Sequence, residues 1–324
     1  MAALTLGACA QQAGPQPLRS PSPPAIPAEL VLVHGETDLQ VVEVRDGTRV
    51  ADLGNGLLAA RLTAGGDFGE AYLAGAAVSS VRPGRPFVVT KLAELPSPAV
   101  SAVLVPAPGL KTYVGDRTVL VVAGRDGVAT GFQHGVQLWR RHLGALTQVG
   151  DVAVVAGEGG TWSRLAPESG EQISVSGPCS PGPVAEVDGA LSLDCSGRPA
   201  PWVLKPLASP PLLVWRDGAV TSLVKGGQVS LGRLTKSPTG PPAVSPDGSA
   251  IFAPIAGGLL VQAPGQGSGY VIAEPGTASV GVSRDGSLLY LRAGGDLVVV
   301  QRGTGRRLAR YPVLAGRIEL VAGG

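Results

Sequence analysis

Short apolar runs, mostly of Val, Leu and Ala, alternate along this chain with segments that contain Gly and Pro. The first three runs are Leu30 to His34, Leu39 to Val44 and Thr48 to Leu53. Runs of this length, bounded by turn residues, are typical of β-strands. The pattern therefore predicts an all-β domain built from many short strands.

One segment of the chain is repeated. Val244-Ser-Pro-Asp-Gly-Ser-Ala-Ile-Phe252 recurs as Val282-Ser-Arg-Asp-Gly-Ser-Leu-Leu-Tyr290. A shorter pair, Val114-Gly-Asp116 and Val149-Gly-Asp151, also stands ahead of apolar runs. The spacing in both pairs is roughly 35–40 residues, which falls in the range of β-propeller blades.

Seven Gly-containing turns separate apolar runs, and we expect each to join the outer two strands of a four-stranded blade. They lie at Arg45–Gly47, Arg82–Gly84, His134–Gly135, Glu168–Gly170, Arg216–Gly218, Gly265–Gly269 and Arg302–Gly305. The first blade has only three strands, so Arg317 to Val321 should supply its innermost strand and close the ring. The sequence predicts a β-propeller of seven blades, or alternatively of eight.

Two motifs resemble those of known propeller families. Ser245-Pro-Asp-Gly248 and Ser283-Arg-Asp-Gly286 resemble the Ser-Pro-Asp-Gly turn of bacterial WD-like repeats. The segment Val136-Gln-Leu-Trp-Arg140, which follows a Gly, resembles the Gly-x-x-Leu-Trp segment of PQQ-type repeats. The resemblance covers the chain from about residue 30 to its end, and it implies a propeller. PQQ-type repeats also build non-enzymatic propeller lipoproteins.

The N-terminal segment resembles that of a bacterial lipoprotein. Leu6-Gly-Ala-Cys9 is similar to a lipobox, which implies lipidation of Cys9, and a Pro-, Gln- and Ser-rich stretch follows. Because that stretch cannot form a core, we expect a semi-rigid tether. The predicted organisation is residues 1–9 as signal remnant, 10–28 as tether and 29–324 as propeller. No Lys or Arg precedes Cys9, so an ordinary apolar N-terminus with a free thiol is the alternative.

The other two cysteines, Cys179 and Cys195, bracket a Gly- and Pro-containing segment that we expect to be an irregular insertion. An even pair in an exported chain is most simply a disulfide, and a reduced buried pair is the alternative. A zinc site is not expected, because His34, His134 and His142 all lie far from both cysteines in sequence.

Charge and composition narrow the function. The 26 Lys and Arg against 24 Asp and Glu leave a net charge of +2, which provides no footprint for nucleic acid. Clusters at Arg140–His142 and at Arg306 to Arg310 are expected on outer strands, where charge discourages edge-to-edge pairing. We expect a monomer.

Candidate catalytic groups are few, so we assign no catalytic, cofactor-binding or metal-binding residue. Asn55 is the one Asn available for a propeller metal site, and no Ser stands in a Gly-x-Ser-x-Gly elbow. One hypothesis is a ring of acidic side chains formed by Asp116, Asp151, Asp188, Asp247 and Asp285. However, an Asp beside a Gly more often accepts hydrogen bonds from the backbone of its own turn. The residues Trp139, Trp162, Trp202 and Trp215 are expected to pack between blades.

The expected function is a non-catalytic interaction or scaffold module held by lipid at a bacterial membrane, in the periplasm or on the cell surface. Its partner would be a protein or an envelope component. The alternative is a small-molecule or metal-binding propeller, lactonase-like or dehydrogenase-like, with its site in the central channel. A purely structural surface protein is the third hypothesis.

Overall fold

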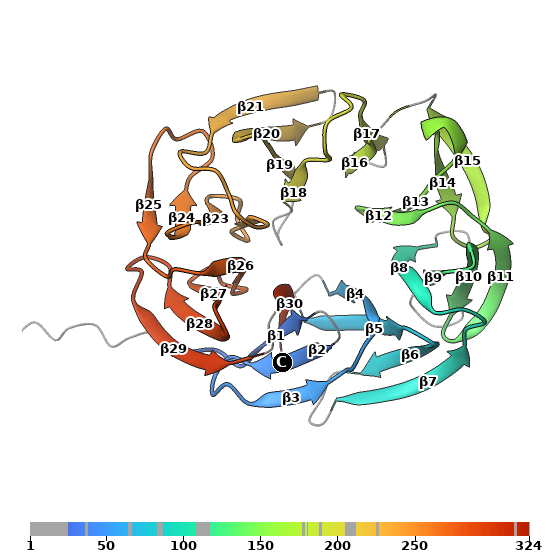
Figure 1. The fold of residues 1–324 in the computed structure, drawn as a ribbon, viewed down its shortest axis with the longest axis horizontal. Coiled ribbons are helices and arrows are strands. Elements are labelled where there is room, and N and C mark those ends of the chain that lie inside the picture. Colours follow the sequence, from blue (N-terminus) through green and yellow to red (C-terminus); the bar gives the residue numbers. More distant parts are fainter. Residues whose placement is uncertain are drawn as a thin grey trace, which may run out of the picture.

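A computed structural model describes residues 25–35, 38–63, 67–82, 87–107, 117–176, 179, 181–187, 190–204, 212–224, 227–313 and 316–323. Their strands form seven four-stranded antiparallel sheets and one two-stranded sheet, arranged around a ring (Figure 1). The chain is thus a β-propeller with seven complete blades, as the repeat predicted. The first blade contains β1 (Glu29–His34), β2 (Leu39–Glu43), β3 (Arg49–Asp52) and β30 (Arg317–Gly323).

The next three blades follow in chain order. The second contains β4 (Leu57–Leu62), β5 (Phe68–Ala74), β6 (Ala77–Arg82) and β7 (Val88–Glu94). The third contains β8 (Ala99–Pro106), β9 (Thr118–Gly124), β10 (Val128–Gln133) and β11 (Val136–His142). The fourth contains β12 (Leu146–Val149), β13 (Val152–Ala156), β14 (Trp162–Ala166) and β15 (Glu171–Ser176), with a 3₁₀ turn at Glu158–Gly160.

The two-stranded sheet of β16 (Gly182–Val187) and β17 (Ala190–Asp194) comes next. The fifth blade contains β18 (Trp202–Leu204), β19 (Leu212–Arg216), β20 (Ala219–Val224) and β21 (Gly227–Arg233). The sixth contains β22 (Ala243–Val244), β23 (Ile251–Ile255), β24 (Gly258–Gln262) and β25 (Gly269–Ile272). The seventh contains β26 (Thr277–Val282), β27 (Leu288–Ala293), β28 (Asp296–Gln301) and β29 (Arg307–Pro312).

Both ends of the chain close the ring. Strand β30 pairs antiparallel with β1, with Val31 opposite Val321 and His34 opposite Arg317, and it is the innermost strand of the first blade (Figure 1). This confirms the closing strand predicted at residues 317–321. Because β1 is paired on both sides, closure leaves it no open edge toward the centre.

Five of the seven predicted turns join the outer two strands of a blade, and the predicted turn at Arg82–Gly84 lies partly outside the described residues. The turn at Arg216–Gly218 does not join an outer pair. It connects β19 to β20, the second and third strands of the fifth blade. The sequence placed it wrongly because the innermost strand of that blade, β18, has only 3 residues. A turn signal identifies two adjacent strands without giving their order in the sheet.

The hydrophobic core is divided among the interfaces between neighbouring blades. Between the third and fourth blades, Val121 and Val155 are fully buried in one cluster with Trp139. Another cluster, around Leu291 and Val298, joins the sixth blade to the seventh. Each buried aliphatic side chain stabilises the ring by about 1.5–3 kcal/mol, so the blades hold one another in place.

Large side chains on outer strands also dock on turn glycines of the following blade. Trp139 of β11 lies against Gly170, where a Cβ would come within 2.7 Å of the indole, and Gly170 has φ of +71°. Tyr311 of β29 covers Gly47 of the first blade in the same way and donates a hydrogen bond of 3.1 Å to the Arg45 carbonyl. These outer turns require Gly because they are both left-handed and closely covered.

The segment between Cys179 and Cys195 is not the irregular insertion that we expected. Its residues form the antiparallel sheet β16–β17, in which Gly182 pairs with Asp194 and Val187 with Ala190. The sheet stands in the ring between the fourth and fifth blades (Figure 1). Its place in the ring is that of a blade, although its described residues form half the strands of one.

Candidate binding site beside the two-stranded sheet

The repeated Ser-x-Asp-Gly turns join the first and second strands of the sixth and seventh blades. Ser245 is fully buried; its Oγ donates to Asp247 Oδ1 at 2.6 Å and accepts from the Ala250 N–H at 2.9 Å. Asp247 Oδ1 also accepts the Ser249 N–H at 3.0 Å. These bonds lower the pKa of Asp247 to about 2. The carboxylate is therefore occupied by its own turn, as the sequence indicated.

Asp285 has the same surroundings in the seventh blade. Burial opposes its ionisation, but hydrogen bonds from Ser283 and Ser287 outweigh that effect, so its pKa is lowered. Asp151 is placed differently, because its carboxylate lies 3.6 Å from the Arg61 guanidinium of the second blade. Asp116 and Asp188 lie outside the described residues. The described acids of this set thus already have partners: Asp247 and Asp285 bond to their own turns, and Asp151 lies beside an arginine.

The four tryptophans pack between sheets, as expected. Trp139 donates to the Pro167 carbonyl at 2.6 Å, from the third blade to the fourth. Trp162 packs with the cluster that joins the fourth blade to the two-stranded sheet. Trp202 and Trp215 are stacked with centroids 4.9 Å apart and pack against the cluster shared by the fifth and sixth blades.

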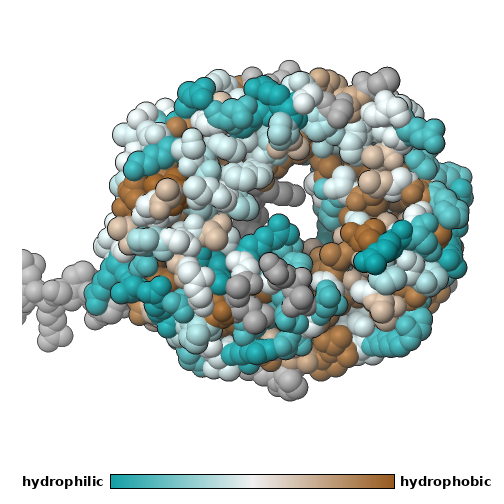
Figure 2. All heavy atoms as spheres, in the orientation of Figure 1, coloured by the Kyte–Doolittle hydropathy of each residue, from teal (hydrophilic) through white to brown (hydrophobic). Residues whose placement is uncertain are grey.

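The remaining predicted residues do not converge on one site. His34 ends β1, 3.5 Å from Glu319, while His134 lies in the β10–β11 turn and His142 ends β11. The exposed arginines of β11 and β29 lie on outer strands, as expected, and hydrophilic residues cover much of the outer rim (Figure 2). Within the described ranges, no group of three or more His, Cys, Asp and Glu side chains could hold a metal ion.

Two further features concern the N-terminal predictions. Cys9 and the tether up to residue 24 lie outside the described residues. Of the part of the chain that the structure covers, no helix has the length and apolar character needed to cross a bilayer.

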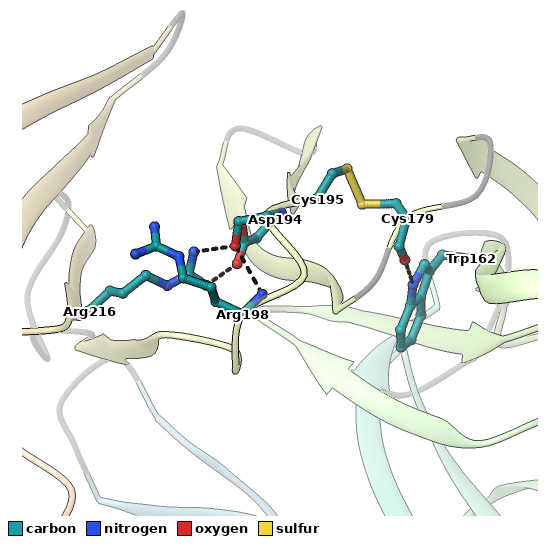
Figure 3. Close-up of a disulfide and its surroundings, with 7 residues drawn as sticks. Trp162, Cys179, Asp194, Cys195, Arg198 and Arg216 are labelled. Atoms are coloured by element: carbon teal, nitrogen blue, oxygen red, sulfur yellow. Dashed lines mark hydrogen bonds and ion pairs between the residues drawn. A yellow bond between two sulfur atoms is a disulfide. The ribbon is translucent and has the colours of Figure 1, made fainter.

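A disulfide joins Cys179 to Cys195, with Cα atoms 4.9 Å apart, and fastens the two-stranded sheet to the ring (Figure 3). Cys179 is buried against the fourth blade: its N–H donates to the Gly160 carbonyl at 2.8 Å, and its carbonyl accepts from Trp162 Nε1 at 2.7 Å. The bond therefore ties the end of β17 to the fourth blade. A disulfide fits an oxidising, extracytoplasmic compartment.

A cavity of about 360 Å³ lies on the other side of this sheet, against the fifth blade. Leu193 and Asp194 of β17 line one wall, and Val214, Thr221 and Arg233 of the fifth blade line another. Part of its lining is apolar and part is charged, which is the mixture found in ligand-binding and peptide-binding sites.

Charged side chains gather at the mouth of this cavity. Arg216 forms an ion pair with Asp194 (Figure 3). It also donates to the Pro199 carbonyl at 3.1 Å. Arg198 pairs with Asp217 at 2.9 Å, and Arg233 donates to the Asp217 carbonyl at 2.7 Å. The Nε of Arg216 is buried without a hydrogen-bond partner in the described structure. The site thus combines arginines that are held by ion pairs and hydrogen bonds with one buried donor, the Arg216 Nε, that has no partner in the described structure.

Sequence reasoning missed this site. Arg216 and Asp217 were noted only as a turn, and Asp194 and Arg233 were not singled out. Their convergence depends on the pairing of β19 with β20 and on the position of β17, which bring together residues about 20–40 positions apart. A usable signal was the length of chain between the fourth and fifth blades, in which the described residues form a single hairpin.

Comparison with known proteins gives similarity in fold alone. No family model matches the chain, and no curated protein sequence matches it significantly. Among solved structures, apo AztD from Citrobacter koseri has a TM-score of 0.48 and 10% identity, over 91% of this chain and 96% of that one. The computationally designed Ika8 protein (TM-score 0.42, 14% identity, 87% and 83% covered) and BamB from Moraxella catarrhalis (0.40, 9%, 88% and 88%) are also similar.

The class of protein is defined by the chain's own geometry. It is an all-β propeller of seven complete blades, closed by strands from both ends, with a disulfide-fastened two-stranded sheet between its fourth and fifth blades.

Proposed function

We propose that this protein is a non-catalytic interaction module that is anchored by lipid on Cys9 outside the bacterial cytoplasm and binds a protein or envelope partner. The observation that supports this most is the two-stranded sheet β16–β17, which a disulfide fixes beside a charged cavity. A fixed surface next to a cavity is suited to recognition, because little conformational freedom is lost when a partner binds.

The rest of the ring supports such a role by providing a rigid frame. Blade interfaces are filled by buried aliphatic residues, and aromatic residues lock outer strands onto turns of the next blade. On rigid scaffolds of this kind, binding residues concentrate in loops and exposed segments. The segment from Cys179 to Arg198 departs most from the blade pattern, so it is the best candidate surface.

The cysteines support the proposed location in two ways. The Cys179–Cys195 disulfide would persist in an oxidising compartment, which supports export. Cys9 follows a lipobox-like segment, which supports a lipid anchor at the membrane. Mass spectrometry of the mature N-terminus from the native host should find a diacylglyceryl-modified Cys9; an unmodified Cys9 thiol would refute the anchor.

Two measurements separate this function from the alternative of a channel enzyme. Crosslinking in envelope fractions should recover a partner with the full chain, and shortening of the β16–β17 hairpin should abolish the capture. Purified protein should not turn over lactones or quinone-linked alcohols, with or without divalent metals. Turnover that is abolished by substitution of a channel-facing acid would refute the interaction module.

A further inference from the structure

The two-stranded sheet is built into the ring as the inner half of a blade. Ala185 of β16 packs with Val214 and Leu223 of the fifth blade. On the opposite face, Leu191 of β17 packs with Val152 and Val154 of the fourth blade. The sheet is therefore wedged between its neighbours as a blade is. Its outer two strand positions, which every other sheet fills, have no strand in the described part of the chain.

Among the described residues, strand β17 consequently has an open outer edge. It pairs with β16 through Asp194, Leu193, Ser192, Leu191 and Ala190, and no other described strand pairs with it. An open edge carries a row of N–H and C=O groups that another extended chain can pair with. The disulfide at the end of β17 fixes this edge relative to the fourth blade.

The charged cavity lies beside this edge, between the two-stranded sheet and the fifth blade. In a complete blade, side chains of a third strand would lie against β20, which here lines the cavity with Ala219, Thr221 and Leu223. The cavity thus lies where a third strand, added beside β17, would bury the side chains that face the fifth blade. Its apolar lining favours aliphatic residues at those positions.

The charge of the lining favours an acidic segment. Three arginines line the cavity against two aspartates, and both aspartates already pair with Arg198 and Arg216. Arg233 is exposed and forms no ion pair with a described residue; its guanidinium donates only to the Asp217 backbone carbonyl. A carboxylate on the incoming segment would find a charge partner there.

We propose that the open edge of β17 receives an extended acidic segment of a partner protein, which adds as a third strand to the unfinished blade. Its backbone pairs with β17, alternate aliphatic side chains fill the cavity, and a carboxylate reaches Arg233. Strand addition of this kind takes affinity from main-chain hydrogen bonds and specificity from pockets for alternate side chains. The inference rests on the proposed interaction function and assigns its surface and partner chemistry.

A random ten-residue peptide display library, selected on the oxidised full-length chain, tests this directly. The enriched sequences should have aliphatic residues at alternate positions and an acidic residue on the same face of the strand, because Arg233 lines the same cavity. A synthetic consensus peptide should bind the wild type, and both Arg233→Glu and Thr221→Trp should weaken its binding by about tenfold or more. Arg140→Glu, an exposed reversal on β11, is the matched control and should leave binding unchanged. The melting temperature of each variant checks its folding.

Backbone methylation of the peptide separates strand addition from charge attraction. An added strand directs alternate N–H groups toward its partner, so methylation of one alternate set should abolish binding while the other set is tolerated. Equal binding of both methylated peptides would overturn strand addition. Failure to enrich any sequence, or equal binding to the Arg233→Glu, Thr221→Trp and Arg140→Glu variants, would overturn the site.

The outcome also separates this inference from the proposed function. If envelope crosslinking captures a partner equally well with wild type, Arg233→Glu and Thr221→Trp, the unfinished blade is not the docking edge, although the protein is still an interaction module. If no partner is captured with any of these three proteins while the peptide binds, the proposed interaction function is refuted, and the peptide-binding edge is not.

Discussion

The Tyr290 hydroxyl donates a hydrogen bond of 2.7 Å to Glu29 Oε2, which connects the last blade to the first across the closure of the ring. The other carboxylate oxygen of Glu29 accepts the Arg284 N–H at 3.1 Å. Glu29 and Tyr290 are both buried, and burial raises the pKa of each. Closure therefore depends on a buried polar contact as well as on the pairing of β1 with β30.

Glu29→Ala should destabilise the fold by about 2–4 kcal/mol, because it removes the hydrogen bonds that Glu29 accepts from the Tyr290 hydroxyl and the Arg284 N–H. Glu29→Gln keeps an acceptor and should cost much less. Urea unfolding at neutral pH measures both. Equal losses for Ala and Gln would show that the hydrogen bonds do not contribute.

The raised pKa of Glu29 also predicts a pH dependence. The folded state holds this proton more tightly than the unfolded chain, so stability from this group falls as pH rises from its ordinary value of 4.5 through the folded pKa. Glu29→Gln should remove that fall. Unfolding free energies measured from pH 4 to pH 8 compare the two proteins; parallel curves would contradict the assignment.

Asp247 should have the opposite pH dependence. Its pKa is lowered from 3.8 to about 2, so the stability that it contributes is present above pH 3.8 and is lost as pH falls toward 2. Asp247→Asn should lower the melting temperature at neutral pH by about 1–3 °C and should weaken the acid dependence. Thermal scans of both proteins between pH 2 and pH 6 test this, and an unchanged acid dependence would refute it.

Replacing both cysteines, Cys179→Ser with Cys195→Ser, should destabilise the protein by up to about 3 kcal/mol in the chain-entropy model. In the folded state the effect should be greatest near the bond, since it fastens the β16–β17 sheet to the fourth blade. Hydrogen exchange should therefore speed up in residues 181–187 and 190–194 more than in the first blade. Uniform exchange changes around the ring would argue against a local clamp.

Deletion of residues 316–324 should open the ring. It exposes the inner edge of β1 and removes the packing of Ile318, Val321 and Ala322, a loss of roughly 3–5 kcal/mol, and should cause aggregation. Light scattering and thermal unfolding detect both effects. A synthetic peptide of residues 316–323 should restore a monomer; a truncated protein that is already monomeric with an unchanged melting temperature would contradict the closure.

Local signals in the sequence predicted most of the fold. The Ser-x-Asp-Gly turns gave the blade repeat because the same short hydrogen-bond pattern recurs after Ser245 and Ser283. The closing strand followed from a count of strands in the first blade. The position of β19 and β20 as the second and third strands of their blade was missed, because strand order in a sheet depends on tertiary pairing. The charged cavity was missed because Arg216 and Asp194 are 22 positions apart and meet only through packing.

Site-specific photo-crosslinking in the native envelope tests the binding account most directly. A benzophenone amino acid is placed at position 192 or 198, beside the unfinished blade, and at position 140 on β11 as the control. We predict that positions 192 and 198 crosslink to one and the same protein and that position 140 does not. Crosslinks that are absent from all three positions, or equal at all three, would contradict the account.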